Sequence, residues 1–93
     1  MTNVAKEKAK IDAFIVDLAA DLKPIVAKIE GDTLPTTRNH YGRYLALFSQ
    51  LSHGDARVGK LVCAALIVAG GNHAGVSDAY RISFGDAPHA YGN

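Results

Sequence analysis

The chain has 93 residues, of which 48% are apolar and 20% charged, so it has room for one hydrophobic core and too much apolar content for a disordered segment. A formal net charge of +1 excludes the composition of a nucleic-acid coat protein or an acidic DNA mimic. The single cysteine excludes an internal disulfide.

Residues 4–30 are predicted to form one long amphipathic helix. Apolar residues recur along it at steps of 4, 3, 4, 3 and 4, which keeps their side chains on one stripe, and Phe14 and Val26 widen that stripe. The six residues of the stripe are Ile11, Ile15, Leu18, Leu22, Ile25 and Ile29. Pro24 removes a backbone donor, yet the periodicity continues through it. We therefore expect one helix with a kink at Pro24, and two separate helices are the alternative.

A second helix is expected over residues 37–52. A glycine and a proline mark residues 31–36 as a linker, because glycine ends helices readily and proline cannot continue them. Thr36 or Thr37 is the expected N-cap. The face that this helix would bury carries Tyr41, Tyr44, Phe48 and Leu51, with Leu45 beside them.

A third helix is expected over residues 55–69, with Asp55 as its N-cap. Residues 61–69 are apolar on every side, which is typical of a helix at the centre of a core. A buried strand is the alternative for this run, because Leu, Ile and Val follow one another within it. Cys63 lies inside the run and is expected to be an inert core thiol.

The glycine-rich residues 70–77 are expected to form a turn between helices. Their spacing resembles a phosphate-binding loop, but the required lysine is replaced by Val76. Ser77 is the expected N-cap of a short fourth helix that ends near Phe84, and residues 85–93 read as a flexible tail. The predicted fold is a single all-α domain over 1–93, a small bundle of three to four helices with a helical core over 37–84.

The sequence offers no arrangement that predicts catalysis or metal binding. The four histidines lie far apart, and no His or Cys pair has the spacing of a metal site; their positions are His40, His53, His73 and His89. The carboxylates of residues 4–30 fall on the solvated side of the predicted helix, with no paired acid and base. We therefore expect no enzyme activity, no cofactor and no metal.

Charge is divided unevenly along the chain. Residues 1–32 carry five basic and six acidic side chains, whereas residues 33–84 carry five basic and two acidic ones. A weak nucleic-acid-binding face is therefore an alternative function, because tyrosines that could stack on bases accompany these cations. The cations of that face would be Arg38, Arg43, Arg57, Lys60 and Arg81.

The length of the first helix predicts a protein partner. A helix over residues 4–30 spans about 40 Å, whereas a compact domain of this size is roughly 30 Å across. Its apolar stripe is therefore buried by a bend round the core, by a second copy of the chain, or by a different protein. We expect a self-associating or partner-binding protein whose interface is made by Ile11, Phe14, Ile15, Leu18, Leu22, Ile25 and Ile29.

The N-terminal residues lack the apolar region of a secretory signal, and the longest apolar run is too short to cross a membrane. We therefore expect a cytoplasmic protein with no membrane association. Small proteins without motifs are common among viral, including phage, accessory, inhibitor and minor structural proteins, and we expect a role of that kind.

Overall fold

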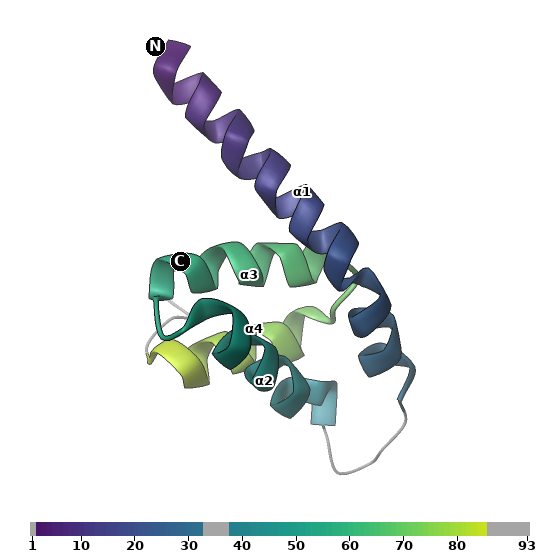
Figure 1. The fold of residues 1–93 in the computed structure, drawn as a ribbon. Helices are drawn as coiled ribbons and strands as arrows, with labels where there is room; N and C mark the ends of the chain where they lie inside the picture. The colour runs from purple at the N-terminus through teal and green to yellow at the C-terminus, as the bar shows by residue number, and fades with distance from the viewer. Residues whose placement is uncertain (1, 33–37, 86–93) are drawn as a thin grey trace.

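The computed structural model describes residues 2–32 and 38–85, and Figure 1 shows that this part of the chain is built from helices. It contains four α-helices and no strand, which confirms the predicted all-α fold. The helices are α1 (Thr2–Gly31), α2 (Tyr41–Ser52), α3 (Ala56–Val68) and α4 (His73–Phe84), and a 3-10 helix, η1 (Arg38–His40), precedes α2. Most of the predicted linker and nearly all of the predicted tail lie outside the described residues.

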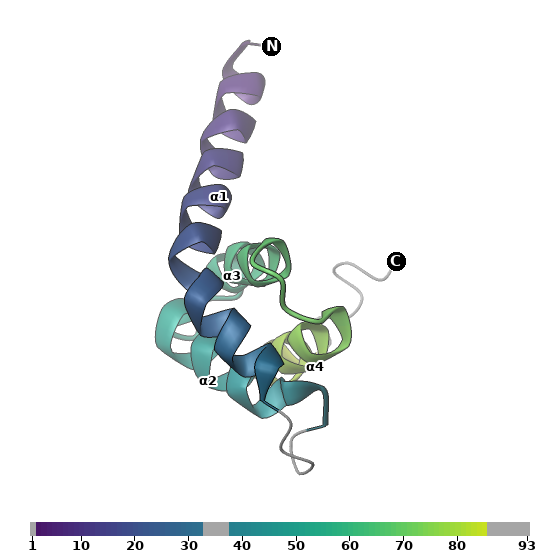
Figure 2. The ribbon, with the colours of Figure 1, turned by 90° about the vertical axis from the view of Figure 1, so that its right-hand side faces the viewer.

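Helix α1 continues unbroken through Pro24, so the prediction of one helix rather than two is confirmed. Its 30 residues amount to about 45 Å at 1.5 Å per residue. The described part of the molecule measures 49 × 28 × 23 Å along its principal axes, so α1 sets its longest dimension. Both views show α1 extending beyond the other helices (Figures 1 and 2).

Helix α2 begins at Tyr41, four residues later than the sequence predicts. The backbone of Asn39 and His40 is left-handed, with φ of 48° and 62°, and this conformation cannot be part of an α-helix. His40 is the N-cap residue of α2, and its side chain makes no capping hydrogen bond. The predicted caps, Thr36 and Thr37, lie outside the described residues.

Helix α3 follows the prediction closely. The carboxylate of Asp55 caps its N-terminus, where it accepts hydrogen bonds from the backbone N–H groups of Arg57 (2.8 Å) and Val58 (3.4 Å). The apolar run is helical through Val68, so the strand alternative is wrong. Cys63 is buried, as expected of a core thiol.

Helix α4 begins earlier than predicted, and its cap is a different residue. Asn72 rather than Ser77 is the N-cap, and its side-chain oxygen accepts a 2.6 Å hydrogen bond from the backbone N–H of Gly75. Ser77 lies within the helix. The turn before α4 contains Gly70 at φ +108°, a conformation that glycine adopts without strain. Residues 70–72 form a turn between helices, whereas residues 73–77, which were expected to belong to the same turn, begin α4.

The core lies between α2, α3 and α4, and α1 covers it by packing mainly on α3. The rings of Phe48 and Tyr80 join α2 to α4 in an edge-to-face contact with 5.8 Å between centroids. The fully buried residues Tyr44, Leu66 and Val76 fill the space between these helices. We call α2, α3 and α4 together the body. Figure 2 shows the body at one end of the molecule and the N-terminal turns of α1 at the other.

Candidate protein interaction surface

The first half of α1 has no cover within the described chain. Every described side chain from residue 3 to residue 14 is exposed. Three of them are large and apolar: the exposed fraction is 72% for Val4, 46% for Ile11 and 50% for Phe14. We call residues 3–14 the arm, and Figure 1 shows it as the purple turns that extend away from the body.

The second half of α1 packs against the body. Ala19, Leu22, Val26 and Ile29 are buried there, and Ile15 and Leu18 are partly buried against the core. Leu22 and Ile29 each retain only 4% exposure. These two residues were predicted to belong to an interface with another molecule, and this prediction needs correction because the chain's own core already covers them.

An apolar row remains open on the adjacent side of α1. We call it the outer stripe, and it consists of Val4, Ile11, Phe14, Leu18 and Ile25. Leu18 is half-buried, whereas Ile25 is 44% exposed although it lies beside the body. At about 100° per residue, the centre of the outer stripe lies about 60° around the helix axis from the side that packs on the body. The outer stripe is therefore open to solvent except at Leu18, which the core covers in part.

The outer stripe agrees only in part with the sequence-based interface. Ile11, Phe14, Leu18 and Ile25 belong to both, whereas Ile15 lies on the packed side, where the core covers it in part. Val4 was missed. It lies seven residues before Ile11, so the same spacing could have extended the stripe to it.

Polar contacts fix the C-terminal end of α1 to the body. Glu30 Oε2 accepts hydrogen bonds from the Tyr44 hydroxyl, from the Asn72 backbone N–H (2.9 Å) and from Asn72 Nδ2 (2.8 Å). Beside them, Arg43 forms an ion pair with Asp32 at 2.5 Å. These contacts hold the last turn of α1 against α2 and against the start of α4, so the direction in which the arm leaves the body is fixed.

The environment of Glu30 keeps its carboxylate ionised. Burial raises the pKa of Glu30, but the hydrogen bonds from Tyr44 and Asn72 favour the charged form, and the net pKa lies below its ordinary value of 4.5. Burial, together with the hydrogen bond to Glu30, raises the pKa of Tyr44 far above 10. Tyr44 therefore acts as a neutral donor to a charged acceptor, which is the stronger kind of hydrogen bond.

A hollow of about 430 Å³ lies where the outer stripe meets α2. Ile25, Lys28 and Ile29 form its α1 side. The α2 side consists of Arg43, Ala46, Leu47 and Gln50. The hollow is therefore an apolar continuation of the outer stripe onto the body, with cations at its margin.

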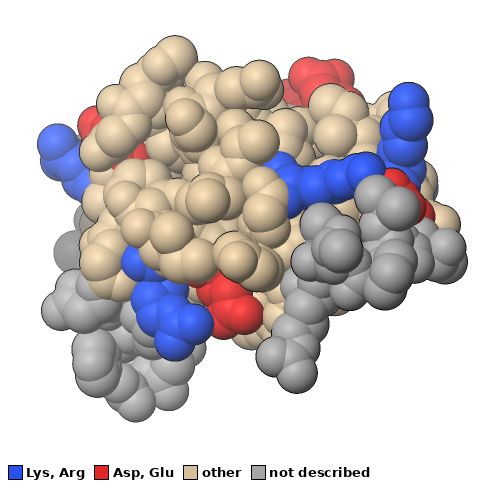
Figure 3. All heavy atoms as spheres, turned by 90° about the horizontal axis from the view of Figure 1, so that it is seen from below, with Lys and Arg blue, Asp and Glu red and all other residues tan. Residues whose placement is uncertain are grey.

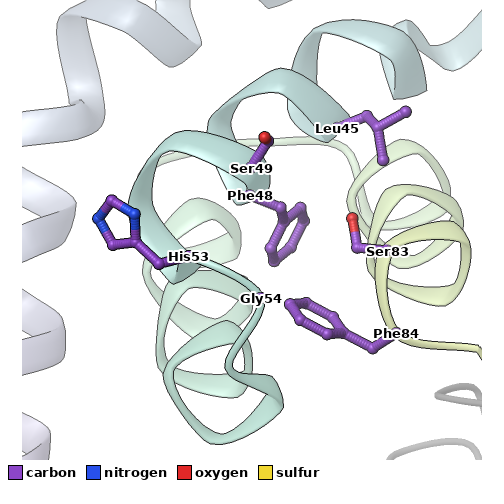
Figure 4. Close-up of a pocket in the computed structure, with 7 residues that line it drawn as sticks. All are labelled: Leu45, Phe48, Ser49, His53, Gly54, Ser83 and Phe84. Carbon is purple, nitrogen blue, oxygen red and sulfur yellow. The ribbon is translucent and has the colours of Figure 1, made fainter.

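A second pocket, of about 510 Å³, opens between α2 and α4 (Figure 4). The rings of Phe48 and Phe84 lie inside it, 6.2 Å apart between centroids. Figure 4 shows that the imidazole of His53 points away from these rings. The other lining residues are Leu45, Ser49, Gly54 and Ser83. This lining contains no carboxylate and no cation, so the pocket lacks a pair of groups for acid and base chemistry.

The predicted basic face is not assembled as one patch. Arg43 is paired with Asp32, and Arg81 is paired with Asp78 at 3.0 Å. Arg57 and Lys60 are exposed on α3. The side chain of Arg38 lies outside the described part of the structure. On the face shown in Figure 3, the Lys and Arg side chains are separated by other residues or adjoin Asp and Glu.

Two further properties of the described residues bear on function. No group of three or more His, Cys, Asp or Glu side chains within ranges 2–32 and 38–85 is placed to hold a metal ion. None of the helices in these ranges combines the length and the apolar character needed to cross a membrane.

Comparison with known proteins found no match. No family model fits the chain, and no curated protein and no solved structure is significantly similar to it.

Proposed function

We propose that this chain is a non-enzymatic protein interaction protein and that the outer stripe of α1 is its interface. The observation that carries the proposal is the exposure of Val4, Ile11 and Phe14 on a helix that extends beyond its own domain. Burying a side chain of this size contributes about 1.5–3 kcal/mol, so contact with another protein chain would be strongly favoured.

The arm also has little to stabilise it as a helix on its own. Isolated helices shorter than about 12–15 residues are marginal in water, and the arm lacks tertiary cover. Two exposed ion pairs support it, Lys8 with Asp12 at 3.1 Å and Glu7 with Lys10 at 3.7 Å, and exposed pairs of this kind contribute little. A bound protein would supply the packing that the arm lacks.

Affinity capture with matched variants tests this proposal. Ile11→Lys with Phe14→Lys places two charges on the outer stripe, whereas Ala9→Lys with Ala13→Lys adds the same charges on the opposite side of the arm. We expect the wild-type chain and the Ala9/Ala13 variant to retain the same protein from the source cell, and the Ile11/Phe14 variant to lose it. Equal retention by all three chains would contradict the proposal.

Nucleic-acid binding through Arg38, Arg43, Arg57, Lys60 and Arg81 stays the alternative. It is the weaker proposal, because the ion pairs of Arg43 and Arg81 already occupy two of these cations. A titration of labelled single- and double-stranded oligonucleotides at about 50 mM salt tests it, because low salt favours phosphate contacts most. Cytoplasmic residence and a viral accessory or structural role also stay predictions.

A further inference from the structure

We infer that the partner of the outer stripe is a second copy of this chain, which pairs with the first so that the two α1 helices run antiparallel. The inference rests on the proposed function, because it names the partner of that same surface. The first support is the sequence pattern of α1, in which the residues of the outer stripe and three charged residues form one row along the helix. The full row is Val4, Glu7, Ile11, Phe14, Leu18, Asp21, Ile25 and Lys28, which advances in alternating steps of three and four. Its members Val4, Ile11, Leu18 and Ile25 recur every seven residues, which is the heptad repeat of a two-helix coiled coil, whereas charged residues occupy three of the four positions between them.

The charges in this row distinguish the two possible directions. In a parallel pair each residue meets its own counterpart, so Glu7, Asp21 and Lys28 would each face a like charge. In an antiparallel pair centred on residue 16, the N-terminal end of one row lies beside the C-terminal end of the other. Glu7 then adjoins Lys28 of the second copy, and Asp21 adjoins Lys8. Every charge in the row therefore has an opposite neighbour only when the helices are antiparallel.

The two charges near the body are available for such contacts. Among the ion pairs of the described residues, none includes Asp21 or Lys28, and both side chains are exposed. Glu7 and Lys8 have only solvent-exposed partners on the arm, at 3.7 Å and 3.1 Å. Surface ion pairs of this kind contribute little to stability, so replacing them by contacts with a second copy costs little free energy.

The shape of the molecule fits the same arrangement. Antiparallel pairing lays the arm of one copy along the second half of α1 in the other, where the outer stripe continues through Ile25. Val4 of the second copy then reaches the hollow of about 430 Å³ between α1 and α2, next to Ile25 and Leu47. The two bodies would lie at opposite ends of such a pair, because each body packs on the C-terminal half of its own α1 (Figure 1). Both uncovered arms are buried by a single closed contact, as in other two-fold dimers.

Sedimentation equilibrium of charge-exchanged variants tests both the identity of the partner and the antiparallel direction of the two helices. We expect the wild-type chain to form a dimer, and Glu7→Lys alone to raise its dissociation constant roughly tenfold, because the introduced lysine would lie beside Lys28 of the other copy at two symmetric places. The double variant Glu7→Lys with Lys28→Glu restores the opposite charges and should return the constant to about the wild-type value. The double variant still lacks the ion pair between residues 7 and 10 of the arm. A recovered dissociation constant would therefore not result from a more stable helix.

Three results would overturn the inference. A dimer that Glu7→Lys does not weaken, or one that the double variant does not restore, contradicts the antiparallel direction. A wild-type chain that stays monomeric at roughly 300 micromolar contradicts the second copy as partner. That last result leaves the proposed function intact if the wild-type chain still captures a different protein through Ile11 and Phe14. Equal capture by the wild-type chain and the Ile11/Phe14 variant contradicts the proposed function itself.

Discussion

The hydroxyl of Tyr44 donates a hydrogen bond to Oε2 of Glu30 and so joins the first turn of α2 to the last turn of α1. Tyr44 is fully buried, and the same carboxylate oxygen also accepts two hydrogen bonds from Asn72 at the start of α4. One side chain therefore positions three helices. It also sets the angle at which α1 leaves the body, and with it the position of the outer stripe.

Removing this carboxylate should destabilise the fold. Glu30→Ala leaves the Tyr44 hydroxyl and both donors of Asn72 without their acceptor, and we expect it to lower the free energy of unfolding by about 2 kcal/mol. Urea unfolding followed by circular dichroism measures the change. Glu7→Ala is the matched control, because Glu7 is exposed on the arm, and it should change the free energy by less than about 0.5 kcal/mol when the chain is dilute and monomeric. Equal effects of the two substitutions would show that Glu30 does not position the helices.

The stabilisation from Glu30 should depend on pH. Its pKa in the folded chain lies below the ordinary 4.5, so the unfolded chain takes up the proton first as the pH falls. The contribution is therefore present in full above about pH 5 and is lost as the pH falls through the folded pKa. We expect the difference in unfolding free energy between the wild-type chain and Glu30→Gln to be constant from pH 7 to about pH 5 and to shrink in more acid solution. Other carboxylates titrate in both chains, so the difference between the chains isolates the contribution of Glu30. A difference that grows as the pH falls would contradict a lowered pKa of Glu30 in the folded chain.

The helices of this fold were predictable from residues that act locally. The 3-4 spacing of α1 and the carboxylate of Asp55 specify a helix and its start without reference to the rest of the chain. The same spacing also predicted correctly that α1 continues through Pro24. For the run around Cys63, helical continuity with the preceding residues decided against a strand.

The features that were not predictable depend on contacts between distant residues. Both Asn72 and Ser77 can cap a helix, and Asn72 does so because it also bonds to Glu30, 42 residues away. The left-handed backbone before α2 has only a weak local signal, because asparagine and histidine adopt it more often than most residues, and the contact of Asn39 with α4 fixes it there. In the candidate interface, spacing identifies the apolar side of α1, but only the packing angle decides that Leu22 is covered and Ile11 is not.

The division of α1 into a packed half and a free arm predicts a large effect of one substitution on stability and a small effect of a similar one. Leu22→Ala removes a buried side chain and should lower the free energy of unfolding by about 3 kcal/mol. Ile11→Ala removes an exposed one and should change it by less than about 0.5 kcal/mol when the chain is dilute and monomeric. Urea unfolding at low and high protein concentration separates folding from association. A large loss for Ile11→Ala in the dilute chain would mean that the body covers the arm.

Two glycines should respond in opposite directions to alanine, because one lies under a neighbouring backbone and the other faces open space. A Cβ at Gly75 would lie 1.9 Å from the carbonyl oxygen of Asn39, so Gly75→Ala must displace η1 from α4, and we expect it to lower the free energy of unfolding by about 2–3 kcal/mol. A Cβ at Gly42 in α2 meets nothing within 4 Å, and alanine favours the helix there, so Gly42→Ala should raise the free energy by about 0.5–1 kcal/mol. Thermal unfolding of both variants measures the two changes. A Gly75→Ala protein as stable as the wild-type chain would contradict the close approach of Asn39 to α4.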